Sequence, residues 1–345
     1  MTKHRQTDQT IKARPTIGFL NSDIEAEWAL LPWLGMVDAA RQHDVTLVTC
    51  VGKIINWAYN FEKQANVLYT LINGERLDGL IIWKAGVVMN LSEPEIEAFC
   101  HQYNVPVVTL EGTVRGYPSV VYGNYQGMRA AIEHLIEIHG YRRIGFMGLH
   151  EHHVGFRERY RAYTDAMAAH GLPVQPALVK PSWSDRDILT GGRESERALT
   201  AWLRQALAAG MEALAGVCDT VTIRVLNTLQ TMGVSVPDEV ALVSFDDFAE
   251  GQVISPPLTT VKPSWYELGR VAVETLIGIL AGRPVPEQII VPSQLMVRQS
   301  CGCLGTAVIQ ASAEPVEQPA RLPSWEMALD QVIPEMIQAA RANAV

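Results

Sequence analysis

The sequence predicts an α/β protein built from two lobes, each with its own sheet of parallel strands. Short apolar runs alternate with amphipathic stretches of helical periodicity along most of the 345 residues. Strands that alternate with helices indicate parallel sheets covered on both faces. About nine strand–helix units are present, and two sheets of about five strands fit them better than a single sheet. The chain length also suits two lobes.

In the first half of the chain, the predicted strands are short runs rich in β-branched residues. We expect them at residues 16–20, 45–51, 77–83, 105–110 and 119–124. A helix is expected next, at residues 125–140, because its apolar side chains recur at helical spacing and Gly140 is suited to end it.

In the second half, the same alternation repeats. Strands are expected at residues 142–148, 177–183, 212–218 and 240–245. Helices are expected near Arg157–His170, Arg193–Ala209, Thr222–Met232 and Trp265–Ala281.

Three extended crossings are predicted between the lobes, near Ile138–Arg142, Thr259–Lys262 and Ile290–Ser293. Prolines stiffen the second and third of these segments and exclude helix there. The first lobe is then predicted to contain residues 14–139 and 263–289, and the second lobe residues 140–262 and 290–303. Residues 304–345 are interpreted as a linker followed by a C-terminal helix interrupted by Pro334.

The composition of the chain limits the classes of function that we expect. The formal net charge is −9, whereas a protein that grips nucleic acid needs a basic face. The N-terminus is polar without the apolar region of a secretory signal, and no apolar run reaches the length of a membrane span. The five cysteines are scattered and odd in number, which favours a reduced, cytoplasmic protein with no membrane partner.

Paired carboxylates follow the buried run at residues 240–245. Asp246 and Asp247 stand where the strand ends, and ligands of open α/β sheets lie beyond the carboxyl ends of the strands. We expect Asp246 to face a cleft between the lobes and Asp247 to serve the structure by capping backbone N–H groups.

The order of several motifs resembles the effector-binding core of LacI-type repressors, which is related to periplasmic sugar-binding proteins. The motifs are "YRRIGFMG", "FRERYRAYTDAMAAHGL", "GVCDTVTIRVLNTLQTMGVSVPDEVALVSFDD" and "SPPLTTVKPSWYELGRVAVETLIGILAG", and the resemblance covers about Thr16 to Cys303. The ending "RQSCGC" is similar to sensor modules of this family that precede a signalling output domain.

The resemblance implies a type I periplasmic binding protein-like fold, with two Rossmann-like lobes that close around a small polar molecule such as a sugar. It implies that Arg159 binds effector hydroxyls and that Asp246 accepts hydrogen bonds from the ligand. Asp219 matches an aspartate of the family's ligand site. Cys218 stands where the family usually has Asn, and Gly123, beside Asn124, stands where it usually has Asp. We include Cys218 and Asn124 in the predicted ligand site.

The resemblance also implies a homodimer. Only about fifteen residues precede the first predicted strand, and a helix-turn-helix headpiece needs on the order of fifty. We therefore expect this chain to lack that headpiece and to reach DNA only through another domain.

Aromatic and polar residues at other strand ends complete the predicted ligand site. Sugar sites need flat apolar faces, and Trp28 and Trp183 lie farthest into the loops after their strands. Asn21 is a polar residue at the end of the first strand.

No cofactor and no metal are predicted. The loop histidines His150, His152 and His153 have no identifiable metal partner in the sequence. Cys301 and Cys303 are one residue apart, whereas metal sites use wider spacings. We therefore interpret "SCGC" as small residues that turn the chain into the linker.

Two alternatives stay open. One is an α/β enzyme that acts on a sugar or nucleotide through Asp246 and Asp247. The other is a degenerate sensor that only dimerises, which Cys218 and Gly123 favour. For the sensor, Arg159→Ala and Asp246→Ala are each expected to weaken ligand binding by roughly 1–3 kcal/mol with the fold intact.

Overall fold

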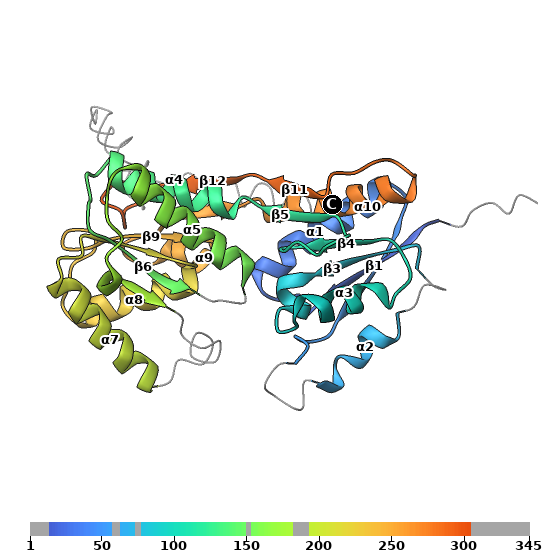
Figure 1. Cartoon of the computed structure of the whole chain (residues 1–345), viewed down its shortest axis with the longest axis horizontal. Helices are drawn as coiled ribbons and strands as arrows, with labels where there is room; N and C mark the ends of the chain where they lie inside the picture. Colours follow the sequence, from blue (N-terminus) through green and yellow to red (C-terminus); the bar gives the residue numbers. More distant parts are fainter. Residues whose placement is uncertain (1–13, 57–62, 73–76, 150–152, 182–192, 305–345) are drawn as a thin grey trace, which may run out of the picture. The chain divides into compact units, whose positions relative to one another are not determined.

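The computed structural model describes residues 14–56, 63–72, 77–149, 153–181 and 193–304. The chain divides into two compact units, Met1–Cys303 and Leu304–Val345. The first unit contains two sheets of six strands each (Figure 1). The predicted C-terminal helix lies outside the described residues.

The first sheet has the strand order β11-β5-β4-β3-β1-β2, and every described pairing in it is parallel. Its strands are β1 (Thr16–Asn21), β2 (Thr46–Val51), β3 (Gly79–Trp83), β4 (Val107–Leu110), β5 (Ser119–Tyr122) and β11 (Gln288–Val291). The central strands β3, β4 and β5 are buried along their whole length. That burial explains why they consist of continuous apolar runs instead of alternating patterns.

The helices of this lobe are α1 (Glu27–Gln42), α2 (Val67–Thr70), α3 (Glu93–His101), α10 (Trp265–Leu280) and the π-helical turn η2 (Lys84–Val88). Helix α3 begins with a capping box, in which Ser92 and Glu95 satisfy backbone N–H groups reciprocally. Helices α1 and α10 pack closely because Gly35 and Gly269 lie at their contact. A Cβ atom on Gly269 would lie 1.8 Å from the Pro32 carbonyl oxygen.

The second sheet has the strand order β12-β10-β9-β8-β6-β7. All its described pairings are parallel except the antiparallel pairing of β10 with β12. Its strands are β6 (Ile144–Leu149), β7 (Val179–Pro181), β8 (Ala213–Gly216), β9 (Ala241–Phe245), β10 (Thr259–Pro263) and β12 (Ser293–Met296). The predicted fold class, two lobes with parallel-dominated sheets, is confirmed.

The helices of the second lobe are α4 (Asn124–Glu137), α5 (Val154–Ala169), α7 (Arg193–Ala208), α8 (Asp219–Thr231), α9 (Ala249–Val253) and the 3-10 turn η3 (Pro176–Leu178). Helix α4 packs on α5 and on β9, β10 and β12 (Figure 1).

The predicted boundary of the lobes at residue 139 is therefore wrong. Helix α4 was expected to belong to the first lobe, but its apolar face is buried on the second sheet. The chain passes between the sheets at Gly123, between β5 and α4, and not near Ile138–Arg142. The sequence pattern missed this because an amphipathic face does not say which of two sheets covers it.

The other two crossings are also one residue long. Ser264 separates β10 of the second sheet from α10, which packs on α1 and the first sheet. Pro292 separates β11 of the first sheet from β12 of the second. The predicted segment Thr259–Lys262 is part of β10 itself, so this crossing lies just after the expected position. Among the described residues, no helix is long and apolar enough to cross a membrane.

Candidate functional site

A cavity of about 470 Å³ lies at the carboxyl ends of the strands, with walls from both lobes. Its volume is in the range of small-molecule sites. The first lobe with α10 contributes Ser22, Asp23, Trp28, Lys53, Ile54, Trp83, Ala85, Gly86, Met89, Glu111, Tyr122 and Trp265. The second lobe contributes His153, Phe156, Arg159, Cys218, Thr220, Asp246 and Phe248.

Arg159 on α5 lies at the wall of this cavity with only 1% of its surface exposed. Its Nε donates to Asn124 Oδ1 at 2.8 Å, and its Nη1 donates to the Val217 carbonyl oxygen at 2.6 Å. Its Nη2 donates to the Tyr122 hydroxyl at 3.0 Å and lies 3.4 Å from Asp246 Oδ1. The guanidinium therefore has most of its donors committed within the protein, and one Nη1 hydrogen remains for a ligand.

The Arg159 network joins the two lobes. Tyr122 ends β5 of the first sheet, whereas Arg159 and Asp246 belong to the second lobe. The guanidinium also lies over the Phe245 ring, 3.6 Å from its centroid. This contact and the hydrogen bonds compensate the burial of a charge that is costly to remove from water.

Asp246 lines the cavity directly after β9. Burial raises the pKa of its carboxyl to about 7, although the Arg159 charge opposes this. Its backbone φ of +117° is far from the conformations that non-glycine residues prefer. Such strain persists only where the surroundings enforce it, and it is concentrated at functional sites.

Glu111 is a second buried carboxyl group at the cavity, and it was not among the predicted site residues. It follows β4, its φ is +53°, and its Oε1 accepts a hydrogen bond from the Tyr122 backbone N–H at 3.1 Å. Burial raises its pKa to about 8. A protonated Glu111 can donate a hydrogen bond while Asp246 beside Arg159 accepts one. The rule that found Asp246, a polar residue where a buried strand ends, applies equally to Glu111.

Asp247 is turned away from the cavity and held by basic side chains. Its Oδ1 accepts from Arg298 Nη2 at 2.6 Å, and Lys262 Nζ lies 3.7 Å from its Oδ2. The side chain is 2% exposed. The expected division of the pair therefore agrees with the geometry, except that Asp247 binds Arg298 and Lys262 and does not cap a helix.

Three of the predicted ligand residues do not line the cavity. Asp219 is fully buried, and its carboxylate accepts from the Phe248 backbone N–H at 2.8 Å and from the Thr260 hydroxyl at 2.7 Å. Asn21 is fully buried, and its Oδ1 accepts from the Ser22 backbone N–H. Asn124 is buried and holds Arg159.

Each of these three side chains is buried and makes hydrogen bonds within the protein, outside the lining of the cavity. Asp219 fixes the loop that carries Asp246 against β10, and Asn124 positions the guanidinium. Neither the resemblance, which predicted Asp219 and Asn124, nor the strand-end position, which predicted Asn21, says which way a side chain turns.

Aromatic side chains form much of the cavity wall. Trp28 packs edge-on against Trp83, with ring centroids 5.4 Å apart, and both line the cavity as Trp28 was predicted to do. Trp265 packs in the same way against Tyr122 at 4.9 Å. Trp83, Tyr122 and Trp265 also stand at strand ends or helix starts, although they were not predicted as ligand residues. Trp183 lies outside the described residues.

Cys218 lies at the cavity wall, 7% exposed. Burial raises the pKa of its thiol to about 12, so it remains a protonated thiol at neutral pH and is poorly suited to act as a nucleophile. His153 is also at the wall, where it caps α5 by accepting from the Phe156 backbone N–H. His150 and His152 lie outside the described residues.

Comparisons with known proteins agree with this architecture. A model of the periplasmic binding protein-like domain matches residues 132–301. The HTH-type transcriptional repressor MelR of Bacillus subtilis is 31% identical over 199 residues, which cover 56% of each chain. The ribose operon repressor of the same organism is 27% identical over 60% of each chain. The PurR repressor of Photobacterium profundum is 28% identical over 67% of this chain and 64% of its own. The chain thus spans about 56–64% of the length of these relatives.

Solved structures share the fold. A LacI-family regulatory protein from Chloroflexus aggregans superimposes with a TM-score of 0.68 at 23% identity, over 83% of this chain and 98% of its own. A complex of the regulator CelR with cellobiose gives a TM-score of 0.67 at 24% identity, over 83% of this chain and 85% of its own. A periplasmic binding protein/LacI regulator from Alkaliphilus metalliredigens, complexed with D-xylulofuranose, gives 0.63 at 21% identity, over 83% and 98%.

Proposed function

We propose that this chain, which contains the periplasmic binding protein-like effector core of LacI-type regulators, is the ligand-sensing part of a transcriptional or signalling regulator. The observation that carries the proposal is the cavity itself, because both lobes supply polar and aromatic side chains to its walls. A ligand that contacts both walls stabilises the arrangement in which the lobes are closed.

The crossings support a hinge mechanism. Three single residues, Gly123, Ser264 and Pro292, connect the two sheets. Rotation about so few backbone positions moves each lobe as a packed unit. The Tyr122–Arg159 hydrogen bond spans the two lobes.

The ligand class that best fits the wall is a small sugar or related polyol. Tryptophan faces suit the apolar face of a pyranose or furanose ring, and carboxyl groups suit pairs of hydroxyls. Asp246 and Glu111 supply the carboxyl groups, and Trp28 supplies an accessible ring. The neighbours complexed with cellobiose and with D-xylulofuranose favour the same ligand class.

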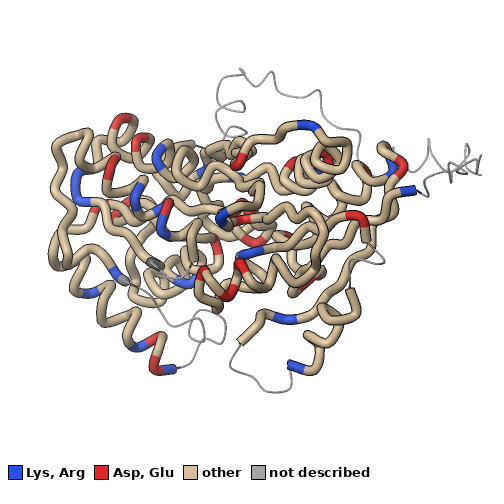
Figure 2. Tube along the Cα trace, turned by 45° about the vertical axis from the view of Figure 1, so that its right-hand side comes forward, with Lys and Arg blue, Asp and Glu red and all other residues tan. Residues whose placement is uncertain are grey.

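The partners of the chain follow from its surface and relatives. Figure 2 shows Lys and Arg interleaved with Asp and Glu over the described part of the chain, and the net charge is −9. Such a surface does not favour direct contact with nucleic acid. We infer that DNA is contacted through another domain, that the chain is a cytoplasmic homodimer, and that it is not an enzyme.

The geometry argues against the enzyme alternative that uses Asp246 together with Asp247. A reaction at paired carboxylates needs both groups at the substrate, whereas Asp247 is tied to Arg298 and only Asp246 lines the cavity. The fit of the cavity to a small molecule also argues against a sensor that only dimerises.

A thermal-shift screen tests the proposal. The probes are D-ribose, D-xylulose, cellobiose and adenosine, each titrated against the full chain, with turnover followed in parallel. We expect saturable stabilisation by at least one sugar without conversion. Asp246→Asn should weaken that response by roughly 1–3 kcal/mol, and Asp238→Asn, an exposed carboxylate of the same lobe, is the matched control. Conversion of a probe, or no response together with no copurified small molecule in the denatured protein, would overturn the proposal.

A further inference from the structure

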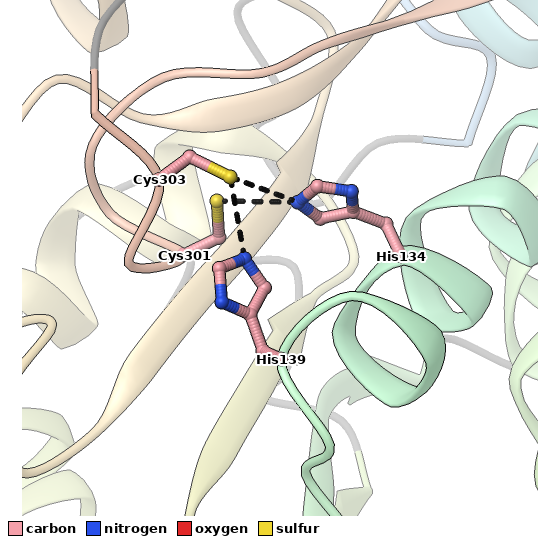
Figure 3. A group of neighbouring side chains, drawn as sticks. All are labelled: His134, His139, Cys301 and Cys303. Carbon is pink, nitrogen blue, oxygen red and sulfur yellow. Dashed lines mark hydrogen bonds between the residues drawn. The ribbon is translucent and has the colours of Figure 1, made fainter.

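Four side chains with metal-binding atoms meet at the end of the second lobe. They are His134 on α4, His139 just after α4, and Cys301 and Cys303 in the segment that follows β12 (Figure 3). One donor atom from each lies within 4.8 Å of all the others. None of the four lines the cavity described above.

Three of the six distances between the donor atoms match the edges of a tetrahedral site. Cys301 Sγ lies 3.4 Å from His134 Nε2, Cys303 Sγ lies 3.6 Å from the same nitrogen, and Cys303 Sγ lies 3.3 Å from His139 Nε2. Around a tetrahedral zinc ion, with bonds of about 2.3 Å to sulfur and about 2.0 Å to nitrogen, the sulfur–nitrogen edges are about 3.5 Å. The three measured edges therefore leave room for one ion at their centre.

The backbone is shaped to bring the two thiols together. Gly302, between the cysteines, has a φ of +102°, a conformation that L side chains rarely adopt. A Cβ atom at this position would lie 3.4 Å from two atoms of the His139 ring. The turn thus directs Cys301 and Cys303 to the same point (Figure 3), although their spacing is unlike that of the common zinc motifs.

We propose that His134, His139, Cys301 and Cys303 form a structural zinc site. Two thiolates and two imidazoles in tetrahedral arrangement are a preferred ligand set of Zn²⁺, and a site closed by four protein ligands serves structure and not catalysis. The Thr259 hydroxyl donates to Cys301 Sγ at 3.1 Å, a contact that supports a thiolate ligand from the second coordination shell.

The cluster is accessible from solvent. His134, His139 and Cys303 are only half-buried, so an ion can reach the cluster.

The site would hold the C-terminal end of the second lobe against α4. Cys301 and Cys303 belong to the last described segment before Leu304, where the second compact unit begins. His134 lies in the last turn of α4, whose first residue Asn124 holds Arg159. An ion at this cluster would link the segment that contains Cys301 and Cys303 to α4, the helix whose Asn124 holds Arg159 at the cavity.

Metal analysis of the full chain tests the proposal. The chain is expressed with added Zn²⁺, purified in reducing buffer and analysed by inductively coupled plasma mass spectrometry. We expect about one zinc per wild-type chain. Cys303→Ser and His139→Asn should each lower bound zinc at least about tenfold. Cys50→Ser and His101→Asn, which alter a cysteine and a histidine outside the cluster, should retain it.

Cobalt spectroscopy on the wild type keeps the test decisive if a variant does not fold. Adding Co²⁺ to the reduced, zinc-free chain should produce thiolate-to-cobalt charge transfer and the absorption of tetrahedral cobalt. The proposal is overturned if the wild type holds no zinc and gives no such spectrum. It is equally overturned if the ligand variants keep their zinc, or if thiol titration of the purified chain shows that Cys301 and Cys303 are joined in a disulfide.

Discussion

The ligand cavity and the Cys/His cluster both bury ionisable groups, but they compensate the burial in opposite ways. At the cavity, Asp246 is accompanied by the guanidinium of Arg159, a cation that belongs to the protein. At the cluster, four metal-binding atoms of His134, His139, Cys301 and Cys303 lie within 4.8 Å of one another. The comparison teaches that a buried carboxylate with a built-in counter-charge is a stable part of the fold, whereas four converging metal-binding donors form a site for an ion from outside.

We expect the largest effect from a substitution that removes Arg159 from its ion pair with Asp246. Arg159→Ala would leave Asp246, Asn124 and the Val217 carbonyl without their partner in a buried site. We expect a loss of about 3–5 kcal/mol in the free energy of unfolding, measured by denaturant titration. Arg161→Ala, which removes an exposed arginine of the same helix, should cost less than about 1 kcal/mol. Equal costs in the two variants would show that the Arg159 network is unimportant for stability.

This expectation corrects the prediction that Arg159→Ala leaves the fold intact. The arginine was expected to reserve its donors for ligand hydroxyls, but the structure uses most of them inside the protein. Asp246→Asn is therefore the better probe of binding, because it keeps the shape of the side chain.

We expect the second-largest effect from removing zinc from the Cys/His cluster. At a free Zn²⁺ concentration of 100 times the dissociation constant, binding stabilises the folded chain by about 2.7 kcal/mol. Removing zinc with a chelator should lower the melting temperature of the wild type, and the same chelator should leave Cys303→Ser unchanged. If chelation does not change the melting temperature of the wild type, the cluster holds no stabilising ion, and the contrast between the two regions is wrong.

The third effect separates the two neighbouring aspartates. Asp247→Asn weakens the ion pairs with Arg298 and Lys262, and we expect a loss of about 2 kcal/mol in unfolding free energy. Its affinity for a responsive sugar should stay close to that of the wild type, whereas Asp246→Asn should lose affinity. Parallel denaturation and titration measure both quantities, and the reverse ranking would show that the roles of the pair are exchanged.

The smallest effect is a change in pH dependence. The pKa of Glu111 is raised to about 8 in the folded chain, so between about pH 4.5 and pH 8 the folded state holds a proton that the unfolded state releases. Stability should therefore fall as the pH rises through this window. Glu111→Gln should reduce that fall by on the order of 1 kcal/mol, measured as unfolding free energy at pH 5 and pH 8.

The control for this experiment is Glu194→Gln, which changes an exposed carboxyl group on α7. It should leave the pH dependence as it is in the wild type. If Glu111→Gln and Glu194→Gln behave alike, Glu111 is ionised throughout the window and its pKa is not raised.

Sequence reasoning located the strand ends better than it located side-chain directions. Arg159, Asp246, Trp28 and Cys218 were predicted at the site, and all four line the cavity. Asp219 and Asn124 were predicted from the resemblance and Asn21 from its place at a strand end, but their side chains turn inward and make hydrogen bonds within the protein. Glu111 was not predicted, although it also follows a buried strand.

Local patterns along the sequence determined the alternation of strands and helices, the two parallel-dominated sheets and the edge at which the cavity lies, because these depend on periodicity and burial within short segments. Only the tertiary structure decided that α4 covers the second sheet, that Asp247 binds Arg298, and that His134 and His139 meet Cys301 and Cys303. Each of these contacts joins residues far apart in the chain, where sequence spacing carries no information about distance. The physical reason is that packing in three dimensions selects the partners of a face or a donor from everything that the fold brings near.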